Sequence, residues 1–262
     1  VGGTAEVSIG FARTTHFITG SNELTESIVQ QHIGDGSSAR DVIITGFTSI
    51  GDNAFQSSNL SGSITIPASV TSIGNNAFKS CTSLTSINFE SGSQLETIDN
   101  YAFDTSGLSG SITLPASLKS IGACAFFYIL SDISVNFDRY SQLTTIGRNA
   151  FHQSRLIGSI SFPSSLQTIG NLAFGSCPLT SVTFQSNSDL TTLGGTNIFD
   201  GAQELLFFYA PPSVLTLFDV DFGVNIKVGG STVGMTVLFT PSTTHIFIGS
   251  GTEPLTSEIV QD

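Results

Sequence analysis

A phrase of six residues recurs along the middle of this chain with a fixed pattern of apolar and polar positions. One copy reads Ile73-Gly-Asn-Asn-Ala-Phe78, and other copies end at Phe55, Phe103, Phe126, Phe151 and Phe174, with a degenerate copy that ends at Phe199. Successive phenylalanines of this series lie 23, 25, 23, 25, 23 and 25 residues apart. A fixed period of this length predicts a solenoid, and the alternation predicts that the duplicated unit is a pair of coils.

Within each coil, alternating apolar and polar residues predict two short strands, as in Ser111-Ile-Thr-Leu114 and Leu118-Lys-Ser-Ile121. A single coil cannot bury its own apolar face, so we expect the coils to stack with each Phe against the Phe of the next coil. The predicted fold is therefore a β-rich solenoid of about seven coils with alternating 23- and 25-residue repeats. At a spacing of about 4.8 Å the stack would be roughly 30 Å long.

The two coil types differ at one corner. A proline turn closes one type, as in Ile64-Thr-Ile-Pro67, and a polar loop two residues longer closes the other. These longer loops are Glu90-Ser-Gly-Ser-Gln94, Asp138-Arg-Tyr-Ser-Gln142 and Gln185-Ser-Asn-Ser-Asp189, and we call the edge they line the corner-loop edge. Insertions in a solenoid lie along one edge, which is often the binding edge. The candidate interaction residues there are Glu90, Asp138, Arg139, Tyr140 and Asp189; Arg and Tyr are enriched at interface hot spots.

A row of hydroxyl side chains is a second candidate surface. It stands directly before the strand Ile or Leu of each coil and consists of Ser49, Ser72, Thr97, Ser120, Thr145, Thr168 and Thr192. A second polar series flanks the other strand, for example Ser86/Asn88 and Ser111/Thr113. We favour the interpretation that short β-compatible polar residues simply face water. The alternatives are O-glycan attachment, contact with a sugar or protein surface, and lattice matching to ice. Asn59, in Asn59-Leu-Ser61, is a candidate N-glycosylation site.

The full repeat resembles the BspA-like leucine-rich repeats over about residues 42–213. One copy reads Val70-Thr-Ser-Ile73-Gly-Asn-Asn-Ala77-Phe78-Lys-Ser-Cys81-Thr-Ser-Leu84-Thr-Ser-Ile87, and seven copies match in register. The resemblance implies a surface-exposed or secreted protein of the kind found in bacteria, protists and large viruses. The best-described members are adhesins for matrix proteins or other cells. The family's Cys is missing from most copies here, and the resemblance supplies no single-residue ligand site.

Composition narrows the range of partners. The chain has 262 residues, with 8 basic and 20 acidic side chains and a net charge of −12. Nucleic acids and anionic membranes attract basic surfaces, so neither is an expected partner. Only 11% of residues are charged, which suits an extracellular or cell-surface protein. No apolar run approaches a membrane span. Because the chain begins at Val1 and shows no signal peptide, we expect it to be a piece of something longer.

No pattern of catalytic or cofactor-binding residues is present. None of the four histidines, His16, His32, His152 and His245, lies at metal-ligand spacing from a Cys or an acidic residue. There is no nucleophile elbow and no phosphate-binding glycine loop. The acidic pairs Asp132/Asp138 and Asp219/Asp221 lack the density of a calcium loop, so we take them as solvated charges rather than ligands. Cys81, Cys124 and Cys177 are expected to be small buried thiols. We therefore predict no enzyme activity, no cofactor and no metal.

The two ends of the chain resemble each other. Val1-Gly-Gly and Thr14-Thr-His16 recur as Val228-Gly-Gly and Thr243-Thr-His245. This predicts a longer period of one β linker, one helix and one solenoid, and head-to-tail self-assembly through residues 1–31 and 228–262. The predicted organisation is a β linker at 1–21, a capping helix and lead-in at 22–41 with Asn22 as N-cap, repeats at 42–213, a C-terminal cap and β linker at 214–249, and the start of the next unit's helix at 250–262.

Together these features predict a non-enzymatic extracellular structural or adhesive repeat protein, a module of a tandem or filamentous surface assembly. The alternative is a soluble or surface ligand-binding module, an adhesin for a host matrix protein or a glycan.

Overall fold

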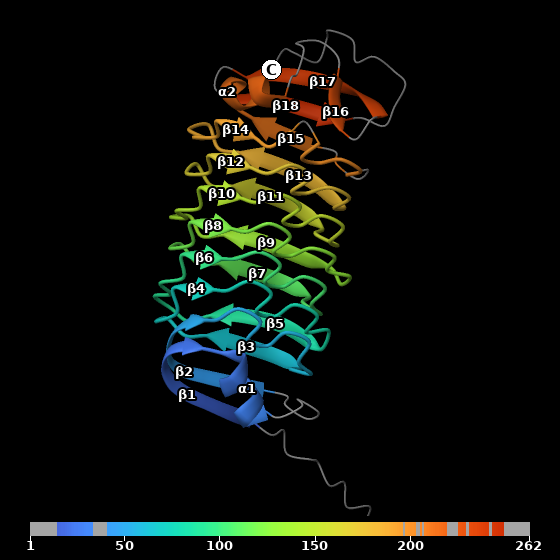
Figure 1. Cartoon of the computed structure of the whole chain (residues 1–262). Helices are drawn as coiled ribbons and strands as arrows, with labels where there is room; N and C mark the ends of the chain where they lie inside the picture. The colour runs from blue at the N-terminus through green and yellow to red at the C-terminus, as the bar shows by residue number, and fades with distance from the viewer. Residues whose placement is uncertain are drawn as a thin grey trace, which may run out of the picture.

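The computed structural model describes residues 15–33, 41–195, 197–202, 205, 207–218, 225–228, 231–240 and 243–248. Coils of β-structure stack in a single column, with helix α1 (Glu26–Ile33) beside its N-terminal end and α2 (Pro212–Leu215) at the other (Figure 1). The predicted β-rich solenoid with a short N-terminal helix is confirmed. Figure 1 also shows strands on two sides of the column, which form two series.

The first series is a ladder of short parallel strands, built where each coil carries its Ile or Leu. It comprises β4 (Ser72–Ile73), β6 (Thr97–Ile98), β8 (Ser120–Ile121), β10 (Thr145–Ile146), β12 (Thr168–Ile169) and β14 (Thr192–Leu193), preceded by the ends of β1 (Thr15–Leu24) and β2 (Asp41–Ile50). Each Ile pairs with the Ile of the next coil, as Ile73 does with Ile98. These side chains are buried, except for the half-buried Leu193 at the end of the ladder.

The column has one more turn than the repeat phrase predicts. Leu24 in β1 pairs with Ile50, and Gly51 N donates to Leu24 O at 2.9 Å, as Gly74 N donates to Ile50 O at 2.8 Å in the next turn. Leu24 is completely buried. The prediction of Asn22 as a helix N-cap is therefore wrong, because Asn22 lies within β1. The helix begins at Glu26, and Val29 N donates to Thr25 O at 3.1 Å in its first turn.

The second series consists of longer strands that do not form one continuous sheet. They are β3 (Gly62–Ile66), β5 (Leu84–Phe89), β7 (Gly110–Leu114), β9 (Ile133–Phe137), β11 (Gly158–Phe162), β13 (Leu179–Phe184) and β15 (Phe207–Ala210). β3 pairs with β5, β7 with β9, and β11 with β13 and then β15, but neither β5–β7 nor β9–β11 forms a ladder. The two breaks follow the first two coils with long corner loops, so the predicted two-coil unit is visible in the strand pairing.

The core is a column of phenylalanines from the repeated phrase. Consecutive rings from Phe55 to Phe199 lie 4.9 to 5.5 Å apart and within 18° of parallel. The backbone follows the same spacing: Phe55 N donates to Ala77 O and Phe78 N to Ala102 O, each at 2.7 Å. The predicted Phe-on-Phe packing is confirmed.

In all repeats but one, a glycine follows the Ile or Leu of the short strand and allows adjacent coils to approach closely; the exception is Ile98, which Asp99 follows. A Cβ atom on Gly147 would lie 2.6 Å from both Ala123 N and the Gly122 carbonyl carbon. No side chain fits at that distance. The glycine at this position is therefore needed for the close packing of adjacent coils.

The C-terminal end of the column is covered by further structure. Val214 and Phe218, from α2 and the 3-10 helix Thr216–Phe218, are buried in the core. β18 (Thr243–Ile248) pairs antiparallel with β15, then with β17 (Ser231–Thr240), which pairs with β16 (Asn225–Val228). Residues 1–14 and 249–262 lie outside the described part of the chain, and with them about half of the predicted head-to-tail region.

Candidate ligand-binding edge

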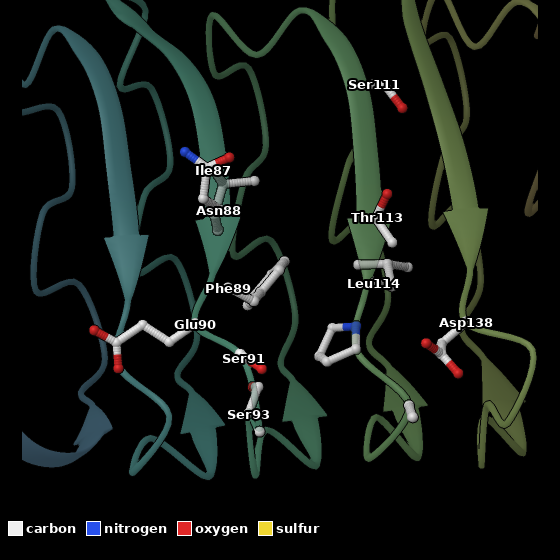
Figure 2. A pocket seen from close by; sticks show the side chains of 13 residues that line it. Ile87, Asn88, Phe89, Glu90, Ser91, Ser93, Ser111, Thr113, Leu114 and Asp138 are labelled. Atoms are coloured by element: carbon white, nitrogen blue, oxygen red, sulfur yellow. The ribbon is translucent and has the colours of Figure 1, made fainter.

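A groove opens between β5 and β7, where the second series of strands is not paired (Figure 2). Its volume is about 440 Å³. The C-terminal halves of β5 and β7, the corner loop after β5, the proline turn after β7 and Asp138 line it. The groove therefore lies on the corner-loop edge, which the sequence singled out for its alternating loop lengths.

The groove begins where the two coils are still bonded to each other. Ser109 N donates to Thr85 O at 3.0 Å and Gly107 N donates to Cys81 O at 3.1 Å, just before the strands run side by side. A Cβ atom on Gly107 would lie 2.1 Å from Thr82 O. The coils are thus clamped together at one end of the groove and lose their pairing toward the corner loops.

Backbone groups line both walls. Glu90 N donates to Ile66 O on β3, and N–H and C=O groups of successive residues point to opposite sides of a strand, so those of Ile87 and Phe89 point toward β7. Gly110 N donates to Asp132 O on the opposite side of β7, so the groups of Ser111 and Thr113 point toward β5. These groups take part in no β5–β7 ladder and need another hydrogen-bonding partner.

The side chains give the groove an apolar floor and a polar rim. Ile87 and Leu114 are buried, and Phe89 is half-buried with its ring pointing from β5 into the opening (Figure 2). Asn88 and Thr113 are exposed on the rim. Ser111 Oγ accepts a hydrogen bond from Asn136 Nδ2 at 2.9 Å, so this hydroxyl links β7 to β9.

The two acidic residues at the groove have different roles. Glu90 points away from the groove in Figure 2, and its Oε2 accepts from Ala68 N at 2.9 Å, which holds the neighbouring proline turn. Asp138 points from the end of β9 back toward β7, and its Oδ1 accepts from Tyr140 N at 2.8 Å. Asp138 therefore shapes its own loop and also places a carboxylate at the groove.

The predicted edge residues all lie at the ends of β5, β9 and β13, on alternate coils. Tyr140 is 69% exposed, and the Arg139 guanidinium lies over its ring at 4.5 Å from the centroid. Asp189 is exposed, and its backbone N donates to Ser164 O at 2.8 Å. All three corner loops are anchored to the neighbouring coil, the middle one by Gln142 N, which donates to Ala116 O at 2.9 Å. Tyr140 projects from this anchored loop into solvent.

The hydroxyl row is in register, as its sequence spacing predicts. Ser49 pairs with Ser72, Ser72 with Thr97, and so on through Ser120, Thr145, Thr168 and Thr192. The first six are half-buried and Thr192 is exposed. Asn59 is exposed in the turn before β3. The roles proposed for the hydroxyl row and for Asn59 remain predictions.

The described residues contain no group of His, Cys, Asp and Glu side chains that could hold a metal ion. Asp132 forms an ion pair with Arg155 at 2.6 Å, and Asp219 and Asp221 lie outside the described residues. Burial raises the pKa of Cys81 to about 11 and that of Cys177 to about 12, so neither is a reactive thiolate. Each thiol donates to a Phe carbonyl one coil earlier, at 2.9 Å.

One surface feature was not predicted. Phe127 and Tyr128 follow the repeated phrase in one coil, where other coils carry pairs such as Gln56-Ser57 and Lys79-Ser80. The Phe127 ring lies 6.0 Å from Tyr128 and 5.8 Å from His152, and Tyr128 is 42% exposed. The break from the polar pattern at these two positions was the signal available in the sequence. These aromatics lie in the turns that carry the repeated Ala-Phe pair, which we call the phenylalanine turns, and not on the corner-loop edge.

The repeat profile described as BspA type leucine-rich repeat region matches six copies, over residues 48–138 and 92–206. The chain belongs to this family. Its repeats generally form non-enzymatic scaffolds for protein interactions. No helix among the described residues is long and apolar enough to cross a membrane. No curated protein matches the chain.

Several solved structures of leucine-rich repeat proteins are similar. The pneumococcal vaccine antigen PcpA is 24% identical, with a TM-score of 0.34, over 65% of this chain and 56% of its own. The Treponema pallidum protein TpLRR is 23% identical, with a TM-score of 0.42, over 71% of this chain and 85% of its own. A Eubacterium ventriosum protein is 16% identical, with a TM-score of 0.40, over 78% of this chain and 72% of its own. The chain thus spans little more than half of the pneumococcal antigen.

Proposed function

We propose that this chain is a module of an extracellular surface protein that attaches to a partner, a surface protein or a glycan, through the corner-loop edge and catalyses no reaction. The observation that carries the proposal is the position of Tyr140. Tyr140 is 69% exposed and its ring carries the Arg139 guanidinium on one face, on the same edge as the groove. Large exposed aromatics beside Arg are typical of binding hot spots.

The rest of the molecule supports a binding scaffold. The phenylalanine column and the hydrogen bonds between coils give a rigid support on which the corner loops are repeated at regular intervals. The net charge of −12 disfavours polyanionic partners. Cys81 and Cys177 are not reactive thiolates, and the described residues contain no group that could hold a metal ion, which fits a protein that binds and does not catalyse.

Attachment can be tested with the whole chain on immobilised matrix proteins, glycans and cells. Tyr140→Ala should weaken attachment by 10-fold or more, since hot-spot truncations lose about 2 kcal/mol or more. Tyr128→Ala is the matched control, because Tyr128 is also an exposed tyrosine but belongs to a phenylalanine turn. Equal loss in both variants, or no attachment to any surface, would overturn the proposal.

We also propose that the chain associates head to tail. This proposal rests on the recurrence of Thr14-Thr-His16 as Thr243-Thr-His245. β1 and β18, which carry parts of the two copies, lie at opposite ends of the column (Figure 1). Sedimentation velocity over a range of concentrations should show association of the full chain and a loss of it when residues 250–262 are removed. A full chain that stays monomeric at all concentrations would rule the contact out.

A further inference from the structure

We infer that the groove between β5 and β7 binds a short neutral saccharide. The inference rests on the proposed binding role of the corner-loop edge and names the class of ligand that the groove fits. The first argument is the backbone of its walls. Ile87, Phe89, Ser111 and Thr113 present N–H and C=O groups that take part in no β5–β7 ladder, so an occupant with many hydrogen-bonding groups is favoured.

The second argument is the combination of an aromatic ring with amide and hydroxyl groups. Phe89 points into the gap between β5 and β7 beside the buried Ile87 and Leu114, while Asn88 and Thr113 stand on the rim of the groove. A pyranose has an apolar C–H face, which packs on an aromatic ring, and a rim of hydroxyls, which pair with amides and hydroxyls. Ligand sites of this kind are mostly apolar, with a few well-placed polar groups.

Charge excludes acidic sugars. No Lys, Arg or His lines the groove, and the Asp138 carboxylate points toward it. A carboxylate accepts hydrogen bonds from sugar hydroxyls but repels a uronic or sialic acid. The ligand is therefore neutral.

Size and shape exclude an inserted peptide strand. A strand between β5 and β7 would require them to lie two strand spacings apart, about 9.6 Å. The coils are bonded to each other at one end of the groove, with Ser109 N only 3.0 Å from Thr85 O. A strand cannot thread past this clamp, whereas a compact ligand fits a volume of about 440 Å³, which lies within the usual range for small-molecule sites.

The corresponding break between β9 and β11 provides an internal comparison. There the clamp is Ile157 N donating to Ile133 O at 2.9 Å, and Phe137 takes the place of Phe89. Phe162 stands where the first groove has Leu114, and its ring lies 6.2 Å from that of Phe137. The break between β9 and β11 therefore holds two aromatic rings, whereas the groove between β5 and β7 holds one ring and a leucine.

This difference supplies the test variants. Leu114→Phe should fill the first groove as Phe162 fills the second, and Phe is already accommodated at this register position in β11 and β13. Phe89→Leu should remove the stacking ring, and Phe137→Leu is its matched control at the second break. Thermal unfolding and circular dichroism of each variant establish that the column is intact.

The experiment is an array of neutral and acidic di- to tetrasaccharides probed with the full chain, followed by calorimetry on the best neutral binder. We expect binding to neutral saccharides only, a loss of 10-fold or more in Leu114→Phe and in Phe89→Leu, and no change in Phe137→Leu. Absence of saccharide binding, preference for acidic sugars, or binding that survives both groove substitutions would overturn the inference.

The outcome is separable from that of the proposed function. If the chain attaches to a matrix protein in a manner that depends on Tyr140 but binds no neutral saccharide, the groove inference fails and the adhesive role stands. If the chain attaches to no surface and binds no saccharide, both fail. Binding of an extended peptide that is blocked by Leu114→Phe would also overturn the saccharide inference, because it would show a different class of ligand in the groove.

Discussion

Phe126 and Phe151 stack with their ring centroids 5.0 Å apart and their planes within 1° of parallel. Each ring has a similar neighbour on its other face, at 5.1 Å for Phe126 and 5.3 Å for Phe151. The spacing of the rings is the spacing of the coils, because adjacent backbone segments are joined by hydrogen bonds at the same positions. If one ring of this column is removed, the neighbouring rings therefore cannot move into the space that it leaves.

Truncation of a ring in the middle of the column should leave an unfilled cavity. We expect Phe126→Ala to lower the free energy of unfolding by about 3–5 kcal/mol, because the coils above and below are held apart by their hydrogen bonds. Urea unfolding followed by circular dichroism measures the change. A loss below about 1 kcal/mol would show that the column collapses around the gap, contrary to this expectation.

The buried thiols should make the protein less stable in alkali. Burial raises the pKa of Cys81 from 9.0 to about 11 and that of Cys177 from 9.0 to about 12, so the unfolded chain ionises these thiols first. Their contribution to stability is complete below about pH 9 and is lost as the pH rises toward 11 and 12. The expected slope is up to about 1.4 kcal/mol per pH unit for each thiol.

A matched variant isolates this effect from other titrating groups. Ser154 Oγ donates to Phe126 O at a position equivalent to that of the two thiols, so Cys81→Ser with Cys177→Ser keeps the hydrogen bond and removes the ionisation. The difference in unfolding free energy between the two proteins should be constant below pH 9 and shrink above it. A constant difference up to pH 11 would contradict the assignment.

Two ion pairs of different burial should contribute differently. Lys79 Nζ lies 3.0 Å from Asp104 Oδ2, whose side chain is only 8% exposed, whereas Lys119 and Glu96, 2.8 Å apart, are about half exposed. Asp104→Asn should lower stability by about 1–3 kcal/mol, because a buried charged partner is lost. Glu96→Gln should change it by about 0–1 kcal/mol. Equal effects in thermal unfolding would mean that burial does not control the strength of these pairs.

Glu90 should act on structure and not on ligand binding. Its carboxylate accepts from Ala68 N in the adjacent coil at 2.9 Å and points away from the groove. Glu90→Ala should therefore speed amide hydrogen exchange at Ala68 and lower stability by about 0.5–1.5 kcal/mol. Attachment through Tyr140 should be unchanged. If Glu90→Ala lost attachment while amide hydrogen exchange at Ala68 stayed normal, Glu90 would instead contact the partner directly.

The sequence predicted the stack well because the signal is local and repeated. The spacing of Phe55, Phe78 and Phe103 defines both the coil and its partner, so the ring column and the strand register follow directly. The first turn was missed because Leu24 fits two patterns: it belongs to the apolar face of a helix over residues 22–33 and also to a strand ladder. In the structure Leu24 is completely buried and pairs with Ile50, so it belongs to the strand ladder.

The groove could not be predicted in the same way. Phe89 and Leu114 hold equivalent apolar positions in their strands, and Glu90 resembles any other exposed acid of the corner loops. What distinguishes the site is the loss of strand pairing between two coils, which depends on the relative position of whole coils and leaves no mark on a single residue. The corner loops were correctly placed on one edge because their spacing in the sequence is regular.

The alternation of the two corner types along the column has a consequence for how such a molecule can change length. Insertion of one coil would bring two corners of the same type together, whereas insertion of two coils repeats the existing junction without altering either end. Each such step would extend the reach of the column by about 10 Å, or two strand spacings, and add one further corner loop. The length of the column and the number of corner loops available for binding would then increase together, by one step for each added pair of coils.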